Sequence, residues 1–215
     1  MAKERGIIFD LDGVLVNTEP LHCRATQETL AAYGVAMSET EYFTRYIAYS
    51  DWELMAMLLP QGRSGEEASA AKSARYLELV RTGIPAFADG LDLLGRTDGY
   101  RLALATGSMR DEAEMALRAH GIRDRFAVVI TREDCTEGKP HPEPFVRAAH
   151  GLGLRSDQCL VIEDTPGGVQ AAKAAGMRCV AVTHSCPAWR LAAADVVVDD
   201  LRDVDLGTMF SGIAR

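Results

Sequence analysis

Long apolar runs are missing from this chain of 215 residues, since no stretch approaches the ~20 apolar residues of a membrane span. Cysteine pairs are missing too, because the five cysteines are odd in number and form no CxxC motif. This pattern argues against a disulfide framework and favours reduced thiols in a cytoplasmic protein. An apolar strand pattern begins within a few residues of Met1, so we expect no signal peptide and no membrane partner.

Basic residues are fewer than acidic ones. The sequence has 23 Lys and Arg against 31 Asp and Glu, which gives a formal net charge of -8. A surface of this charge argues against nucleic acid or an anionic membrane as the main partner. It leaves room for a local basic pocket that binds a phosphate group.

Several common catalytic motifs are also absent. No GxSxG or HExxH sequence occurs, and Pro140 follows Gly138-Lys139 where a Walker A loop requires Ser or Thr. What is present is an ordinary globular composition, with 47% hydrophobic and 25% charged residues. The length suffices for one large core, or for a core with a smaller second domain.

The pattern of secondary structure changes near residue 84. Residues 5–10 are predicted to form a strand, whereas residues 18–82 show only helical periodicity. We expect about four helices in that segment. Their predicted N-caps are Thr18, Ser38, Asp51 and Ser64.

Strands alternate with helices after residue 84. The further predicted strands are short apolar runs at residues 101–105, 126–130, 159–163, 179–182 and 196–198. Ser108 is expected to cap the helix after the first of these, with Asp111 completing a capping box. Such alternation indicates a parallel sheet covered on both faces. The predicted fold is α/β: a doubly wound, Rossmann-like sheet from residues 1–16 and 84–215, with an inserted α-helical bundle at 17–83.

Polar side chains follow several of these strands. The segments concerned are Asp10-Leu11-Asp12, Thr106-Gly107-Ser108 and Glu163-Asp164, with Lys139 in a further loop. In a doubly wound sheet the site lies at the carboxyl ends of the strands. One carboxylate could attack a substrate and another could move a proton, with a divalent cation between them. Each group alone could instead cap a helix, form an Asx-turn or lie in solvent, but their joint occurrence favours a catalytic site.

Four motifs in these loops together resemble the haloacid dehalogenase superfamily. They are DLDGVL (Asp10–Leu15), Ala105–Ser108, Gly138–Pro140 and Glu163–Gly168, the last running on to Met177. The resemblance is to the branch that includes β-phosphoglucomutase and small phosphometabolite phosphatases. The insertion at 17–83 resembles the cap domain of that branch.

The resemblance implies a role for each core residue. Asp10 is expected to be the nucleophile that forms an aspartyl-phosphate, and Asp12 the general acid and then the general base. Thr106 and Lys139 are expected to hold the phosphoryl oxygens.

A metal and a substrate site are implied in the same way. The cofactor is expected to be Mg²⁺, and its implied ligands are Asp10, Asp12 (through its backbone carbonyl), Glu163 and Asp164. The residues implied to bind the substrate, a small phosphorylated metabolite, are Gly107, Ser108, His22 and Lys72. We expect a monomer, with a weak dimer as the alternative.

Three functions remain open at this point: a phosphatase, a phosphomutase and a binding protein that has lost catalysis. Asp51 aligns where the mutase has a phosphate-binding arginine, and none of the core residues is missing, so we expect a phosphatase. Asp12 counts against a dehalogenase, which lacks that second aspartate. The candidates for substrate choice in the cap are Arg45, Tyr49, Asp51, Trp52, Lys72 and Arg75, although each taken alone is more often a packing or solvated residue.

Overall fold

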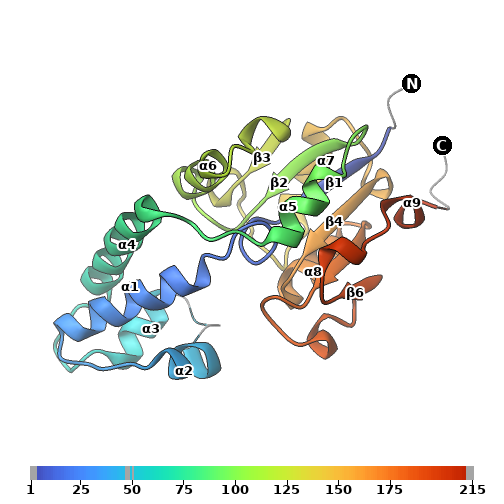
Figure 1. Cartoon of the computed structure of the whole chain (residues 1–215). Helices are drawn as coiled ribbons and strands as arrows, with labels where there is room; N and C mark the ends of the chain where they lie inside the picture. Colours follow the sequence, from blue (N-terminus) through green and yellow to red (C-terminus); the bar gives the residue numbers. More distant parts are fainter. Residues whose placement is uncertain (1–3, 47–48, 50, 212–215) are drawn as a thin grey trace. The chain divides into compact units, whose positions relative to one another are not determined.

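The computed structural model describes residues 4–46, 49 and 51–211. The chain divides into two compact units (Figure 1). Unit 1 comprises residues 1–17 and 85–215, and unit 2 comprises residues 18–84. The chain therefore leaves unit 1 shortly after its first strand and returns to it at Pro85.

Unit 1 contains one parallel sheet, in which the described residues form six strands. The strands are β1 (Gly6–Phe9), β2 (Arg101–Ala105), β3 (Val128–Ile130), β4 (Cys159–Glu163), β5 (Arg178–Val182) and β6 (Val196–Val198). Their order across the sheet is β3-β2-β1-β4-β5-β6. This is the strand order of the Rossmann fold, so the predicted doubly wound α/β class is confirmed.

Helices connect these strands. The α-helices of unit 1 are α5 (Ala88–Gly95), α6 (Arg110–Ala119), α7 (Glu143–Gly151), α8 (Pro166–Ala174) and α9 (Leu206–Met209). Short 3₁₀ helices lie at Arg123–Arg125, Arg132–Asp134, Ser156–Gln158, Ala188–Leu191 and Leu201–Asp203. Helix α5 is an element that the sequence pattern did not predict.

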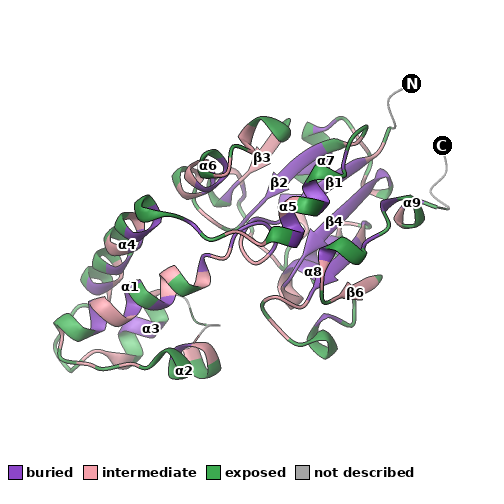
Figure 2. Ribbon diagram, viewed as in Figure 1, coloured by how far each residue is buried: buried purple, intermediate pink, exposed green. Residues whose placement is uncertain are grey.

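Strand β1 is buried on both faces of the sheet. Ile8 lies in one core cluster with Phe145 of α7. Successive side chains of a strand point to opposite faces, so Ile7 and Phe9 lie on the other face. All three side chains have no exposed surface, and Figure 2 shows the central strands as buried. Burying such a side chain stabilises the fold by roughly 1.5–3 kcal/mol, so each of these three residues contributes to holding the strand in the centre of the sheet.

The topology also places the end of β1 beside the end of β4. The strand order reverses there, and Phe9 pairs with Ile162. The Asp10 amide donates a 3.0 Å hydrogen bond to the Ile162 carbonyl. Asp10 and Glu163 therefore lie at the ends of adjacent strands at the switch point, where doubly wound proteins bind ligands.

The regular secondary structure among the described residues of unit 2 is all helical. Its elements are α1 (Glu19–Ala32), α2 (Glu39–Glu41), a π-helical turn (Tyr42–Tyr46), α3 (Asp51–Leu58) and α4 (Gly65–Thr82). A small core of Leu30, Met55 and Ala68 joins α1, α3 and α4.

Two of the four caps predicted for this unit are confirmed. The Ser38 and Ser64 hydroxyls accept hydrogen bonds from Glu41 and Glu67 amides. Thr18 makes no such bond, because its backbone is already helical, whereas a capping residue is extended. Asp51 is the first residue of α3 and not its cap, and its carboxylate binds Lys72 instead.

All five cysteines are free thiols, as the sequence predicts. In the part of the chain that the structure describes, no helix combines the length and apolar character needed to span a bilayer.

Candidate active site

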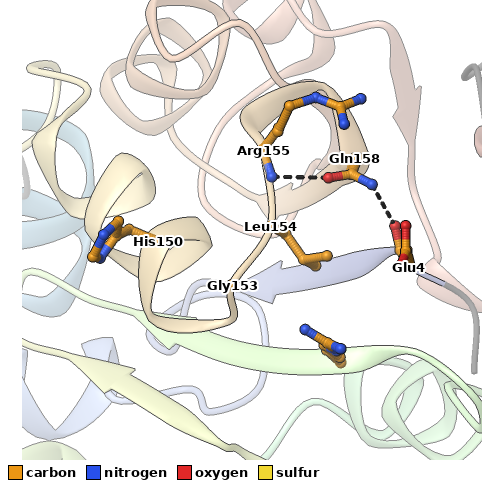
Figure 3. A pocket seen from close by; sticks show the side chains of 7 residues that line it. Glu4, His150, Gly153, Leu154, Arg155 and Gln158 are labelled. Atoms are coloured by element: carbon orange, nitrogen blue, oxygen red, sulfur yellow. Dashed lines mark hydrogen bonds between the residues drawn. The ribbon is translucent and has the colours of Figure 1, made fainter.

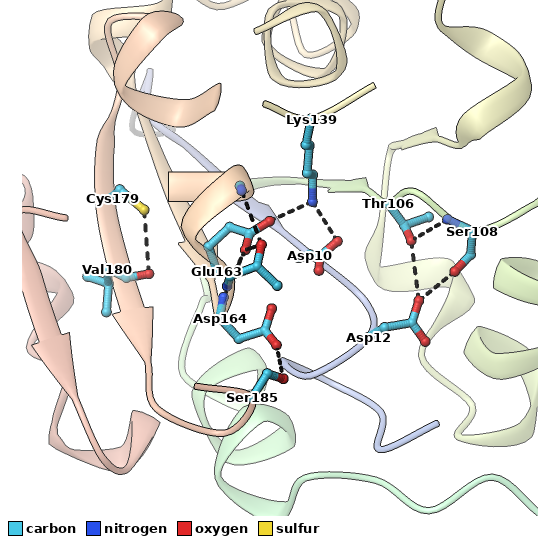
Figure 4. Close-up of polar contacts among 12 residues, drawn as sticks. Asp10, Asp12, Thr106, Ser108, Lys139, Glu163, Asp164, Cys179, Val180 and Ser185 are labelled. Atoms are coloured by element: carbon cyan, nitrogen blue, oxygen red, sulfur yellow. Dashed lines mark hydrogen bonds and ion pairs between the residues drawn. The ribbon is translucent and has the colours of Figure 1, made fainter. Parts of the chain in front are cut away.

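Lys139 joins two acidic side chains at the carboxyl edge of the sheet (Figure 4). Its Nζ lies 2.7 Å from Oδ1 of Asp10 and 2.6 Å from Oε1 of Glu163. Asp10 follows β1, Glu163 ends β4, and Lys139 comes from the loop before α7. All three side chains are largely buried, so their charges interact strongly.

The charges of Lys139, Asp10 and Glu163 shift one another's pKa values. Burial, together with the nearby Glu163 and Asp12 carboxylates, raises the pKa of Asp10 to about 7 although Lys139 opposes the shift. Burial works against the charge of Lys139, but Asp10 and Glu163 outweigh it and raise the Lys139 pKa. Burial likewise opposes ionisation of Glu163, yet Lys139 and two backbone amides hold its pKa below the usual range. The lysine is therefore charged and Glu163 is its ionised partner.

Asp164 adds a third carboxylate to this group. One carboxylate oxygen from each of Asp10, Glu163 and Asp164 lies within 4.8 Å of the other two. Burial and the two neighbouring carboxylates raise the pKa of Asp164 well above its usual value. Its Oδ1 is buried and has no hydrogen-bond partner among the described residues. A divalent cation with oxygen ligands fits this cluster, because it would satisfy that oxygen and balance the surplus negative charge.

Asp12 is held by the loop that follows β2. The Ser108 hydroxyl donates a 2.5 Å hydrogen bond to Oδ2 of Asp12, while the Thr106 hydroxyl lies 3.5 Å from the same oxygen. The Ser108 amide donates to Oγ1 of Thr106. Gly107 lies between these two residues, and nothing lies within 4 Å of the position that a Cβ would take there.

The expected helix cap at Ser108 is wrong. Helix α6 begins at Arg110, so Met109 is at the N-cap position, and Glu112 accepts a hydrogen bond from the Met109 amide. The box thus lies one residue later than the pattern suggested, and neither Ser108 nor Asp111 belongs to it. This shift leaves the Ser108 hydroxyl free to bind Asp12.

Gly13 permits the close approach of the two acidic loops. Its φ of +79° is a left-handed conformation that disfavours other residues. A Cβ at this position would clash with Oδ2 of Asp164 and would lie 2.7 Å from the Ser185 hydroxyl. The turn after Asp12 can therefore pack against Asp164 only because residue 13 is glycine.

Ser185 is a site residue that the sequence analysis missed. Its hydroxyl donates a hydrogen bond to Oδ2 of Asp164, as Figure 4 shows. Ser185 lies in the loop after β5, and the rule that polar residues after parallel strands gather at one edge would have found it. The strand predicted at 179–182 is followed by Thr183, His184 and Ser185, which are polar residues of the kind that the rule selects.

His22 and Lys72 form a separate cluster inside unit 2. The Lys72 side chain is buried, and its Nζ donates to Nδ1 of His22 at 2.6 Å and to Oδ2 of Asp51 at 2.8 Å. The His22 ring stacks on Tyr76 with centroids 3.9 Å apart. Burial and then Lys72 lower the pKa of His22 to about 3, so the ring is neutral and can accept this hydrogen bond. A role for this pair in substrate binding stays a prediction.

The other candidates in unit 2 have varied surroundings. Tyr49 and Trp52 are exposed, Arg75 pairs with Glu28 and Glu78, and Arg45 lies over the Tyr46 ring. Any part that they have in substrate choice also stays a prediction.

A surface hollow of about 450 Å³ lies elsewhere on unit 1 (Figure 3). Its lining residues are Glu4, Arg101, His150, Gly153, Leu154, Arg155 and Gln158. Arg101 is the first residue of β2, so the hollow is at the amino edge of the sheet, opposite Asp10. Its two arginines are engaged with the Leu152 carbonyl and with Asp157. The cluster of Asp10, Lys139 and Glu163 therefore lies at the opposite edge of the sheet from this hollow.

Comparisons with known proteins identify the family of the chain. Residues 7–182 match the family model described as haloacid dehalogenase-like hydrolase. The chain is 34% identical to validoxylamine A 7'-phosphate phosphatase of Streptomyces hygroscopicus subsp. limoneus, covering 92% of this chain and 94% of that protein. It is 35% identical to the fructose-1-phosphate phosphatase YqaB of Escherichia coli, covering 82% of this chain and 95% of that protein.

The chain is also similar to a solved structure of a related protein. The crystal structure of a CbbY mutant from Rhodobacter sphaeroides in complex with xylulose-(1,5)bisphosphate has a TM-score of 0.80 and 29% identity. The match covers 97% of this chain and 99% of the other. The expected enzyme class, a phosphoric monoester hydrolase, is thus confirmed, and the chain belongs to the haloacid dehalogenase-like hydrolase family.

Proposed function

We propose that this enzyme is a Mg²⁺-dependent phosphatase that hydrolyses a small phosphorylated metabolite through an aspartyl-phosphate on Asp10. The observation that carries the proposal is the contact of Lys139 with both Asp10 and Glu163, beside the Asp12 carboxylate. A buried carboxylate next to a buried ammonium is suited to meet a dianionic phosphate, since the ammonium offsets the repulsion between the two anions.

The first step transfers the phosphoryl group to the enzyme. An Asp10 carboxylate oxygen attacks phosphorus, and the bond from phosphorus to the leaving oxygen breaks. Asp12 begins protonated and gives its proton to that leaving oxygen. Ser108 keeps the Asp12 side chain in one orientation through its 2.5 Å hydrogen bond.

The second step releases inorganic phosphate. Asp12, now ionised, takes a proton from a water molecule whose oxygen attacks phosphorus. The bond between phosphorus and the Asp10 oxygen breaks, which restores the Asp10 carboxylate and the protonated Asp12. Lys139 and Thr106 hold the phosphoryl oxygens during both steps. The Thr106 hydroxyl can donate to the substrate, because its hydrogen bond to Asp12 is long and weak.

Asp10, Glu163 and Asp164 would hold the metal, with the Asp12 backbone carbonyl as a further ligand. When bound, Mg²⁺ supplies positive charge that draws the carboxylate nucleophile and the phosphate together. The buried oxygen of Asp164 without a partner among the described residues supports this assignment.

The proposed substrate is a sugar phosphate or another polyol phosphate. Two of the three relatives compared above are named or described with sugar phosphates. Residues 17–83 would act as a cap that closes over the substrate, with His22 and Lys72 among the residues that contact it. We keep the monomeric state and the cytoplasmic location as predictions.

Phosphate release from a panel of sugar and polyol phosphates tests the proposal. The wild type should release phosphate with Mg²⁺, and EDTA or Asp10→Asn should abolish the release. Full activity in Asp10→Asn would overturn the assignment of the nucleophile. A hexose 1-phosphate offered with a bisphosphate primer tests the mutase alternative, because isomer formed without free phosphate would replace hydrolysis as the function.

Metal binding can be measured without turnover. Saturation at 100 times the dissociation constant should stabilise the wild type by about 2.7 kcal/mol. Asp164→Asn should lose this gain, yet be more stable than the wild type without metal, because it removes one of three crowded carboxylates. Asp98→Asn is the matched control, since this carboxylate is 95% exposed and lies outside the cluster.

A further inference from the structure

The loop Thr183–Cys186, which follows β5, contacts both acidic segments of the site. His184 contacts the segment after β1, and Ser185 and Cys186 contact the residue after β4. Neither the sequence motifs nor the mechanism above uses this loop.

His184 fixes the turn that follows Asp12. Its Nδ1 lies 2.8 Å from the Gly13 carbonyl oxygen. A carbonyl oxygen can only accept, so Nδ1 carries the proton of this hydrogen bond. The Gly13 amide in turn donates to the Val16 carbonyl. Both polar groups of Gly13 are thus held, which fixes the direction in which the chain leaves Asp12.

The other side of the His184 ring is held as well. Its Nε2 lies 3.2 Å from Oδ2 of Asp89, and its face stacks on Phe87 with centroids 3.9 Å apart and an angle of 8°. The same Asp89 oxygen accepts a 2.8 Å hydrogen bond from the Leu201 amide. These contacts lock the ring, so Nδ1 is presented to Gly13 in one orientation.

Ser185 orients Asp164 from the same loop. Its hydroxyl donates to Oδ2, which leaves Oδ1 of that carboxylate as the oxygen without a partner in the described structure. The Cys186 thiol lies 3.5 Å from the Asp164 carbonyl. At its start the loop is anchored to the chain around β6, because the Thr183 amide and hydroxyl donate to Val198 and Asp199.

We infer that the loop Thr183–Cys186 is a positioning element of the active site, in which Ser185 aims Asp164 at the metal and His184 holds the turn that orients Asp12. The inference rests on the proposed function for its chemistry, but the role of Ser185 and the role of His184 each have a test of their own. Neither residue touches the reacting atoms. Their effect passes through the carboxylates that they hold.

The Ser185 half is tested by metal binding alone. Mn²⁺ binding, followed by electron paramagnetic resonance, should weaken ~10-fold in Ser185→Ala, as is common when a partner of a metal ligand is removed. Thr183→Val is the matched control, because it removes a hydroxyl of the same loop that faces Asp199 and not the site. Equal weakening in both variants would show general loop damage and would overturn the role of Ser185. Unchanged binding in Ser185→Ala would overturn it too.

The His184 half is tested by two conservative variants. The amide nitrogen of Asn can take the place of Nδ1, and that of Gln the place of Nε2. His184→Asn should therefore keep kcat within ~3-fold, whereas His184→Gln should lose ~10-fold in kcat with little change in KM. Equal kcat values in the two variants would overturn the role of the Gly13 contact. A wild type without phosphatase activity would refute the proposed function and leave the metal test of Ser185 valid.

Discussion

Oδ2 of Asp12 accepts a 2.5 Å hydrogen bond from the hydroxyl of Ser108, a residue 96 positions later in the chain. The bond joins the loops after β1 and β2, which are adjacent strands of the sheet. It restrains the rotation of the Asp12 side chain without supplying a charge of its own. The Asp12 side chain is thus held in a defined direction by a residue of the neighbouring loop.

The loss of rate caused by Asp12→Asn should depend on the leaving group of the substrate. Loss of a general acid costs ~10²–10⁴-fold in rate, and the loss is largest where the leaving oxygen is strongly basic. We expect a large loss with an alkyl phosphate and a much smaller loss of the first step with 4-nitrophenyl phosphate. Without the base, the phosphoenzyme should persist, so rapid mixing should give a burst of ~one equivalent of nitrophenol. Asp10→Asn should give no burst, and equal losses with both substrates would contradict the role of Asp12 as an acid.

Lys139→Met should reduce stability as well as activity. Removing one partner of a buried ion pair costs ~3–5 kcal/mol, because the remaining charges stay buried without compensation. Urea unfolding in the absence of metal measures this cost. Lys173→Met is the control, since the Lys173–Asp195 pair is more than a third exposed and should cost less than ~1 kcal/mol. Similar losses of unfolding free energy in the two variants would show that the ion pairs of Lys139 are worth no more than an exposed pair.

Gly13→Ala should be far more damaging than Gly34→Ala. Both glycines have nearly the same φ, +79° and +77°, so both substitutions carry the left-handed penalty of ~1–2 kcal/mol. Only at Gly13 would the new Cβ clash with Asp164, whereas nothing lies within 4 Å at Gly34. We expect Gly34→Ala to remain active and Gly13→Ala to lose both metal binding and activity. Similar effects of the two substitutions in urea unfolding and metal titration would refute this reading.

His22 should make unit 2 sensitive to acid. Burial lowers its pKa from 6.5 to about 3, so below pH 6.5 the unfolded chain gains a proton that the folded unit does not. Stability is therefore full above pH 6.5 and falls as the pH drops towards 3, by about 2 kcal/mol at pH 5. Hydrogen exchange read by mass spectrometry can follow the helices of this unit between pH 7 and pH 5.

The dependence on pH should be nearly absent in His22→Gln. His150→Gln should keep it, because that histidine is an exposed residue of α7. An equal pH response in the wild type and His22→Gln would exclude His22 as the source.

The fold could be predicted because its strands are short apolar runs with polar residues at one end. Strands β2, β4 and β6 have the predicted bounds, β1 and β5 differ from them by no more than one residue at either end, and β3 begins two residues later than predicted. The clustering of Asp10, Lys139 and Glu163 could also be predicted, because the carboxyl ends of parallel strands, and the loops after them, lie at one edge of the sheet.

Other features depend on contacts that local patterns do not contain. Ser108 fits a helix-capping pattern, and only the bond to a residue on another strand shows its use. Lys72 lies on the packed face of α4 with Ala68 and Tyr76, and only the contacts of its ammonium with Asp51 and His22 show how a charged residue is accommodated there. The position of Ser185 after a strand indicates its place at the site edge, but its partner Asp164 and the His184 partner Gly13 come from segments that the chain brings close only by folding.

The central place of β1 in the sheet has a consequence for synthesis. Gly6 pairs with Arg101 on one side and with Cys159 on the other, so β1 leaves the ribosome long before either partner strand exists. At ~5–20 residues per second, the wait for β4 is ~10–30 s. The helices of unit 2 rely on contacts closer in sequence and can form during that time. Strand β1, whose side chains are fully buried in the folded protein, therefore stays an unpaired apolar segment of the nascent chain until its partner strands have been made.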